Sequence, residues 1–167
     1  MRVMKLYVMR HGPAEERSDS GLDGDRALTP SGRERVRSVA KALAEGGEEP
    51  LDIVTSPLVR AVQTAEIVAI TTKLTDRGGN VETRRELAPG SDAATFVTGL
   101  TMHPKRRVMI VGHEPDLSEL ASRLLGRPLP VAMGKAMVVG LSLQERGGAR
   151  LRFVLEPKTL AWEHDDR

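Results

Sequence analysis

The stretch Val3-Met4-Lys5-Leu6-Tyr7-Val8-Met9-Arg10-His11-Gly12-Pro13 decides the fold. Residues 3–9 are mostly apolar and include β-branched side chains, and the run ends abruptly at a Gly-Pro pair. An apolar run of this length followed by a turn signal is typical of a buried strand. The pattern therefore predicts a strand in the core, with Arg10 and His11 at its carboxyl end.

Two helices and one further strand are predicted in the first half of the chain. Thr29-Pro30 provides a helix cap and a proline for the first turn, and Gly46-Gly47 ends that helix. Residues 51–54 are short and apolar and predict a second strand. The next residues, Thr55-Ser56-Pro57, again predict a cap and a first-turn proline, for a helix that runs to about Ile70.

The second half continues the alternation of strands and helices. Its predicted elements are, in order, a possible edge strand at residues 81–87, a helix capped by Ser91 that runs through Leu100, a strand at 107–111, a helix opened by Pro115, a hairpin of residues 136–143 and 149–155, and a tail or covering segment at 158–167. The sequence therefore predicts an α/β fold: a three-layer α/β/α sandwich with a mostly parallel central sheet. A single domain spanning residues 1–167 is expected for a chain of this size.

Composition excludes several classes of function. The chain has no cysteine, so disulfides, thiolate nucleophiles and thiolate metal sites are excluded, and the cytoplasm is the expected compartment. Residues 1–9 lack the apolar core of a signal peptide, and no stretch reaches the roughly 18 apolar residues of a membrane span. The net charge is only +2, and one Trp, one Tyr and two Phe offer little for stacking on bases. We expect neither a membrane nor a nucleic-acid partner.

Three segments place polar side chains at one expected edge of the sheet. Arg10-His11-Gly12 and His113 each follow a predicted strand, and Arg60 lies in the first turn of a predicted helix. Sites in α/β folds gather beyond the carboxyl ends of the strands. A first-turn arginine sits at the positive end of the helix dipole, which favours an anion there; an exposed guanidinium or a carboxylate partner is the alternative. His113-Glu114 lacks the second histidine of a zinc helix, so neither a metal nor a cofactor is expected.

The sequence around these residues resembles a known family. Met9-Arg10-His11-Gly12, residues 56–65 (SPLVRAVQTA) and Val111-Gly112-His113-Glu114-Pro115 together resemble the signatures of the histidine phosphatase superfamily. Leu28-Thr29-Pro30 before Gly32, and Glu86-Leu87 before Pro89-Gly90, resemble its short bacterial branch, the SixA-type phosphohistidine phosphatases. The resemblance spans residues 4–143 and implies a phosphoglycerate mutase-like fold.

The resemblance implies a role for each matched residue. His11 matches the nucleophile that becomes phosphorylated, Arg10 and Arg60 match the phosphate-binding arginines, and His113 matches the second histidine of the pocket. Gly12 is expected to leave room for the backbone to approach the anion. Two guanidiniums beside His11 disfavour its protonation, which keeps a lone pair available for attack.

Glu86 separates two classes of substrate. It is the candidate general acid, and the alternative is a surface or arginine-paired carboxylate. An alkoxide leaving group needs a proton, whereas phosphohistidine departs as an imidazole and needs little help. The leading expectation is a phosphatase acting on phosphohistidine of a phosphorylated protein. The alternatives are a phosphatase for a small phosphate ester such as a sugar phosphate or nucleotide, with Glu86 as the acid, and a non-catalytic phosphate-binding signalling module. The oligomeric state is left open.

Overall fold

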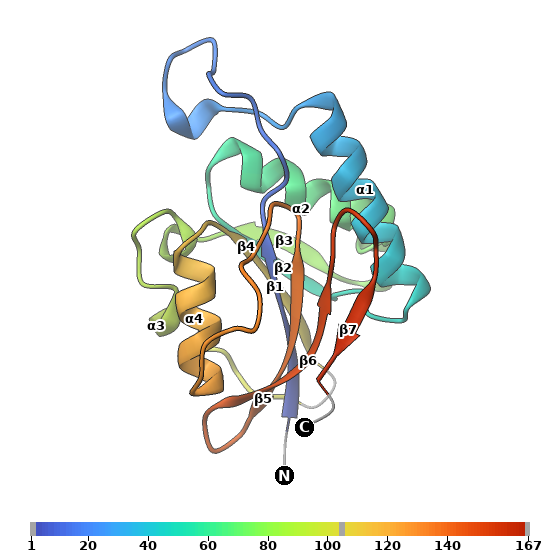
Figure 1. Cartoon of the computed structure of the whole chain (residues 1–167), viewed down its shortest axis with the longest axis vertical. Coiled ribbons are helices and arrows are strands. Elements are labelled where there is room, and N and C mark those ends of the chain that lie inside the picture. The colour runs from blue at the N-terminus through green and yellow to red at the C-terminus, as the bar shows by residue number, and fades with distance from the viewer. Residues whose placement is uncertain (1–2, 104–105, 166–167) are drawn as a thin grey trace.

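The computed structural model describes residues 3–103 and 106–165, which form a seven-stranded sheet flanked by helices (Figure 1). The strands lie in the order β3-β2-β4-β1-β5-β6-β7. Their bounds are β1 Val3–Arg10, β2 Asp52–Thr55, β3 Asn80–Thr83, β4 Arg107–Gly112, β5 Val138–Gln144, β6 Ala149–Leu155 and β7 Trp162–His164. The strand predicted from the opening stretch, β1, lies at the centre of the sheet.

The sheet has a parallel and an antiparallel half, which meet at β1. Strands β3, β2, β4 and β1 pair in parallel, and β5, β6 and β7 follow as antiparallel neighbours. The predicted hairpin is confirmed as β5 and β6. Of the two alternatives predicted for residues 158–167, a tail or a covering segment, the second holds for Trp162–His164. These residues pair with β6 as an edge strand, and the Trp162 ring packs 4.8 Å from the Phe153 ring, measured between centroids. Residues 166–167 of that stretch lie outside the described residues.

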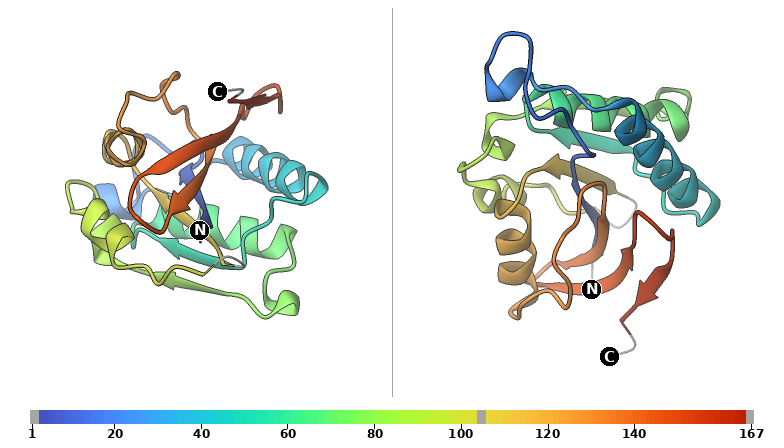
Figure 2. Two further views of the ribbon diagram at one scale, coloured as in Figure 1. Left: turned by 90° about the horizontal axis from the view of Figure 1, so that it is seen from below. Right: turned by 45° about the horizontal axis from the view of Figure 1, so that its top comes forward.

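Helices cover both faces of the sheet and complete the predicted sandwich (Figure 2). They are α1 Pro30–Glu45 and α2 Val59–Thr71 on one face, and α3 Ala93–Thr98 and α4 Asp116–Leu125 on the other; short 3₁₀ turns are η1 Asp23–Asp25, η2 Thr75–Arg77 and η3 Arg85–Leu87. No helix within the described ranges combines the length and the hydrophobicity that a membrane crossing requires.

The side chains of β1 alternate between two cores, as the two-residue period of a strand requires. Tyr7 and Met9 belong to the core beneath α1 and α2, whereas Leu6 and Val8 belong to the core beneath α3 and α4. All four are completely buried. A strand covered on both faces has an apolar run without polar alternation, which is the pattern read from residues 3–9.

The helix starts were predicted with mixed success. Helix α1 is as predicted, because the Thr29 side chain accepts a hydrogen bond from the Gly32 N–H at 2.9 Å and Pro30 is its first residue. Helix α2 begins only at Val59, after Thr55-Ser56-Pro57, so the cap predicted there is wrong. Helix α3 is capped by Asp92, whose carboxylate accepts from the Thr95 N–H, and not by Ser91.

Candidate active site

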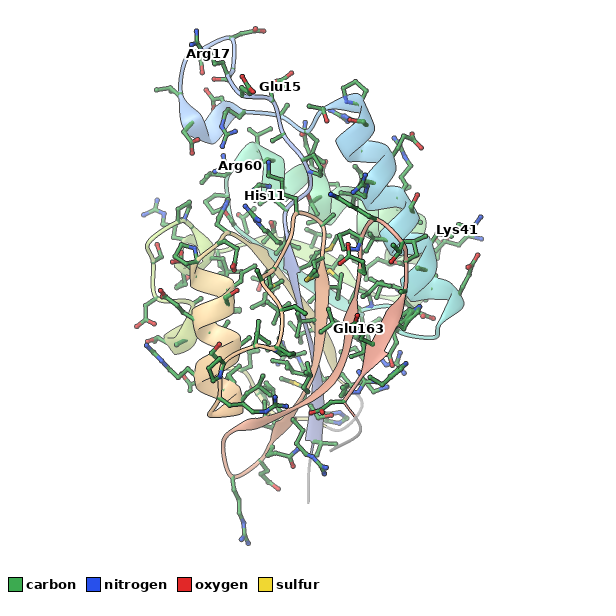
Figure 3. The ribbon with its side chains drawn as sticks, viewed as in Figure 1. His11, Glu15, Arg17, Lys41, Arg60 and Glu163 are labelled. Carbon is green, nitrogen blue, oxygen red and sulfur yellow. The ribbon has the colours of Figure 1, made fainter. Side chains whose placement is uncertain are left out.

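Four of the predicted side chains meet at the carboxyl edge of the parallel strands. Arg10 ends β1 and His11 follows it, His113 follows β4, and Arg60 is the second residue of α2, which follows β2. They line a cavity of about 370 Å³ together with Ala14, Asp23, Arg26, Pro89, Glu114 and Lys135. Figure 3 places His11 and Arg60 side by side, below the loop that carries Glu15 and Arg17. Two backbone hydrogen bonds join the strand ends: the His11 N–H donates to the Gly112 carbonyl at 3.1 Å and the Ser56 N–H to the Val111 carbonyl at 2.9 Å.

The imidazole of His11 is held in one tautomer. Its Nδ1 lies 2.8 Å from the carbonyl oxygen of Gly12, and because a carbonyl only accepts, Nδ1 carries the hydrogen. The lone pair of the neutral ring is then on Nε2. His11 is only 7% exposed, and this burial, with the charges of Arg60, Arg10 and Lys135, lowers its pKa from the ordinary value to about 4. The ring is therefore neutral at physiological pH and has a lone pair for attack.

His113 lies next to His11 in the lining of the cavity. The two ring centroids lie 5.2 Å apart, and Nε2 of His113 lies 2.8 Å from Oγ of Ser56. That oxygen also accepts the Leu58 N–H at 3.2 Å, so its own hydrogen can be donated to His113. Burial, followed by the charges of His11 and Arg60, lowers the pKa of His113 to about 3. Both histidines are thus neutral at physiological pH.

The two arginines are anchored from different elements. A terminal nitrogen of Arg10, NH1, donates to the Met133 carbonyl at 2.9 Å, and Arg60 donates through NH1 and NH2 to the backbone carbonyl and carboxylate of Asp23 at 2.9 and 3.1 Å. The sequence had left a carboxylate partner open for Arg60, and Asp23 is that partner. Three buried polar atoms around the cavity have no hydrogen-bond partner among the described residues: Nε of Arg10, Nε of Arg60 and Nδ1 of His113. Such groups are rare in folded proteins, and a catalytic role is one of the reasons for which they occur.

The structure gives a packing reason for Gly12, while its predicted role beside an anion stays a prediction. Its N–H donates to Oγ1 of Thr64 at 3.0 Å, and its carbonyl accepts from His11, so its backbone groups are occupied within the protein. A Cβ at this position would lie 2.6 Å from Cγ2 of Val36 in α1. The glycine permits the close approach of α1 to the site loop.

The structure leaves Glu86 outside the group. It lies in η3, half-buried, and does not line the cavity. The carboxylate that sequence reasoning missed is Glu114, whose oxygens accept from the Ser118 N–H at 2.9 Å and from the Ser118 hydroxyl at 2.5 Å. Asp23 was missed as well, because it is one of several acids in a polar loop and nothing local distinguishes it.

The cavity lining favours an anion. Its cationic side chains are Arg10, Arg26, Arg60 and Lys135, against the carboxylates Asp23 and Glu114, while the two histidines are neutral. Among the described residues, no three His, Cys, Asp or Glu side chains gather in the manner of metal ligands. A phosphate group, with its negative charge and acceptor oxygens, matches this lining.

Comparisons with known proteins agree with this geometry. The model of the histidine phosphatase superfamily (branch 1) matches residues 6–88. An uncharacterized protein of Picosynechococcus sp. is 37% identical over 156 residues, which cover 89% of each chain. Phosphohistidine phosphatase SixA of Escherichia coli is 27% identical over 160 residues, 94% of this chain and 96% of that protein.

Solved structures show the same fold. The protein histidine phosphatase SixA complexed with tungstate superposes with a TM-score of 0.83 at 26% identity, over 95% of this chain and 100% of that one. A phosphoglycerate mutase from Plasmodium falciparum, at 16% identity, has a TM-score of 0.66 over 100% of this chain and 97% of that one. The predicted phosphoglycerate mutase-like fold is confirmed.

Proposed function

The chain is a phosphatase of the histidine phosphatase superfamily, and we propose that it acts through a phosphohistidine intermediate on His11. The observation that carries this proposal is the hydrogen bond from Nδ1 of His11 to the Gly12 carbonyl, which leaves the Nε2 lone pair in a cavity lined by cations. Nε2 forms a bond to phosphorus as the bond to the leaving group breaks. Water then attacks the phosphohistidine, releases inorganic phosphate and restores His11.

The surrounding side chains supply the electrostatic part of the mechanism. Arg10 and Arg60 bind the phosphoryl oxygens, and His113 gives a further contact beside His11. In a loose phosphoryl-transfer transition state, positioning and charge stabilisation do most of the catalytic work. This assignment accounts for the buried guanidinium of Arg60 and the half-buried one of Arg10 beside a histidine whose pKa is lowered to about 4.

Within the part of the chain that the structure describes, the cavity lacks a free carboxyl group that could protonate a leaving group, and this favours phosphohistidine as the substrate. Both lining carboxylates are engaged: Asp23 with Arg26 and Arg60, and Glu114 with both donors of Ser118. Neither is a carboxyl group free to protonate a leaving alkoxide. As the P–N bond of phosphohistidine breaks, the substrate histidine leaves as a neutral imidazole, its other ring nitrogen having taken a proton from water and left hydroxide in solution. The relation to a phosphohistidine phosphatase of E. coli supports the same substrate class, on a phosphorylated protein.

The test compares wild type with His11→Ala on a phosphohistidine-containing protein and on para-nitrophenyl phosphate, with a chelator present. We expect the variant to lose both activities, and wild type to prefer the first substrate. His164→Ala is the matched control, because this exposed histidine lies on edge strand β7 and should leave both rates unchanged. Wild-type activity in His11→Ala would refute the nucleophile, and preference for the ester would refute the substrate class.

A substitution of Glu86 tests whether the substrate is phosphohistidine or a small phosphate ester. If Glu86 were the general acid, Glu86→Gln would abolish hydrolysis of sugar phosphates while sparing aryl phosphates, whose leaving groups need no proton. Because Glu86 does not line the cavity, we expect less than a twofold change with either substrate. Trapping of phosphate on His11 at alkaline pH would exclude the non-catalytic signalling module, and its failure with every phosphorylated compound would favour that module.

A further inference from the structure

Among the described residues, the guanidinium of Arg60 has its hydrogen-bond partners on a single residue, Asp23. Arg60 is 5% exposed, and burial of a charge is costly without a partner. Within the described part of the chain, the hydrogen bonds of this guanidinium go to Asp23 alone, through the backbone carbonyl and one carboxylate oxygen. Two N–H groups are used in this way, which leaves the others for a ligand in the cavity that both residues line.

Asp23 is itself anchored, although its side chain is 66% exposed. Its second carboxylate oxygen accepts from Nε of Arg26 at 2.9 Å, and Arg26 donates through NH1 to the Glu15 carbonyl at 2.8 Å. Its backbone carbonyl also accepts the N–H of Arg26 at 3.2 Å, which closes the turn η1. The loop thus presents a fixed carboxylate and carbonyl to Arg60.

We propose that Asp23 is a positioning residue: it holds the guanidinium of Arg60 in the orientation that receives the phosphoryl group. This inference rests on the proposed function. A long arginine side chain has several rotatable bonds, and ordering it on binding costs conformational entropy. If the side chain is already fixed before the ligand arrives, binding does not bear this entropic cost. Asp23 makes no contact with the reacting atoms in this scheme, and its effect passes through Arg60.

The Asp23 carboxylate that orients Arg60 also carries a negative charge, which would act against phosphate binding. The two effects have opposite signs, so the inference can be tested. A carboxylate in the cavity repels phosphate, so a purely competing anion would weaken ligand binding. The conservative variant separates the two. Asp23→Asn keeps an acceptor oxygen for Arg60 but removes the charge, whereas Asp23→Ala removes both.

The experiment measures binding of inorganic phosphate by calorimetry in wild type, Asp23→Ala and Asp23→Asn. We expect Asp23→Ala to weaken binding about tenfold and Asp23→Asn to stay within about threefold of wild type, the scale on which outer hydrogen-bond partners act on a bound ion. Asp25→Ala is the matched control, since the Asp25 carboxylate contacts Ser20 in the same loop at 2.6 Å and should leave binding unchanged. Tighter binding in both Asp23 variants would overturn the inference in favour of a competing anion.

A double-mutant cycle with Arg60→Ala completes the test, with urea unfolding of each variant to verify folding. If Asp23 acts through Arg60, Asp23→Ala causes no further loss of phosphate binding in the Arg60→Ala background. Equal losses in both backgrounds would overturn the inference. Binding requires no turnover, so failure of the His11 mechanism would appear in the activity assays alone, and the Asp23 result would be read independently.

Discussion

At the scale of single residues, the protonation of His11 is set by its surroundings. A carbonyl oxygen fixes the hydrogen on Nδ1, and burial with nearby cations lowers the pKa to about 4. His113 is neutral for the same main reason, burial. Two neutral histidines beside the arginines Arg10 and Arg60 favour an anion, but burial of the histidines costs the fold stability at acid pH.

The lowered pKa of His11 predicts how the free energy of unfolding depends on pH. Between pH 6.5, the ordinary histidine pKa, and pH 4, the His11 side chain is protonated in the unfolded chain but neutral in the folded one. Stability that is present above pH 6.5 is therefore lost as the pH falls toward 4, by an amount on the order of 3 kcal/mol for His11. Urea unfolding at a series of pH values, in buffer without phosphate, measures this slope. His11→Gln should flatten the curve; curves that stay parallel would show that the loss arises elsewhere.

Arg60 and Gly12 show how one residue type can have more than one physical reason. A first-turn arginine suggested an anion, and the structure supplies Asp23 as a partner inside the protein. A glycine beside a histidine suggested an approach to phosphate, and the structure shows contact with α1. In both cases the residue type indicated that the position is special. Which contact it makes there was determined by a neighbour that is distant in sequence, Asp23 for Arg60 and α1 for Gly12.

At the scale of elements, the site loop and α1 pack at a distance that only glycine allows. Gly12→Ala places a methyl group against Val36, which is completely buried, so α1 or the loop must shift. We expect a loss of about 1 to 3 kcal/mol in the free energy of unfolding, the usual cost of overpacking. Val36→Ala in the same chain should recover part of it, because it removes the clashing methyl group.

Urea unfolding of the two single variants and the double variant measures this coupling. Gly24→Ala is the control, since its nearest neighbour is 3.8 Å away at Cγ of Leu58 and its backbone needs no positive φ. If Gly12→Ala were as stable as wild type, the contact with α1 would not be tight in solution. If the losses simply added, Val36 would not be the residue that opposes the methyl group.

At the scale of the whole molecule, a charged cluster joins distant elements away from the site. Glu48, in the loop before β2, accepts hydrogen bonds from the Tyr7 hydroxyl at 2.7 Å and from Arg152 of β6 at 3.0 Å. Lys5 of β1 lies 3.9 Å from the same carboxylate. None of these side chains lines the cavity described for the site.

Removal of this carboxylate should reduce stability and leave catalysis intact. Glu48→Ala deprives a buried hydroxyl and a half-buried guanidinium of their partner, with an expected loss of about 2 kcal/mol. Glu45→Ala is the control, because its pair with Lys41 is exposed and contributes little. Thermal unfolding and phosphatase kinetics on the same samples check both parts. A change in kcat of Glu48→Ala would mean that the cluster is coupled to the site.

Much of this protein could be predicted wherever the deciding interactions are local in the chain. The apolar run of β1, the cap and proline of α1, and the turn of the β5–β6 hairpin are signals within a few residues, and each predicted its element. The motifs around His11, Arg60 and His113 predicted the family, and parallel strand topology explains why their side chains meet at one edge.

Other features were decided only in three dimensions. Edge strand β7 depends on pairing with β6, and Asp23 became the partner of Arg60 through a loop with several equivalent acids. Helix α2 begins at Val59, and Ser56, predicted as part of its cap, contacts His113 instead. Glu86, chosen by its motif, lies outside the cavity, while Glu114 lines it. The physical reason is common to all of these cases: capping and hydrophobic period act between neighbours in sequence, whereas charge pairing, strand-edge pairing and close packing depend on which distant segments the folded chain brings into contact.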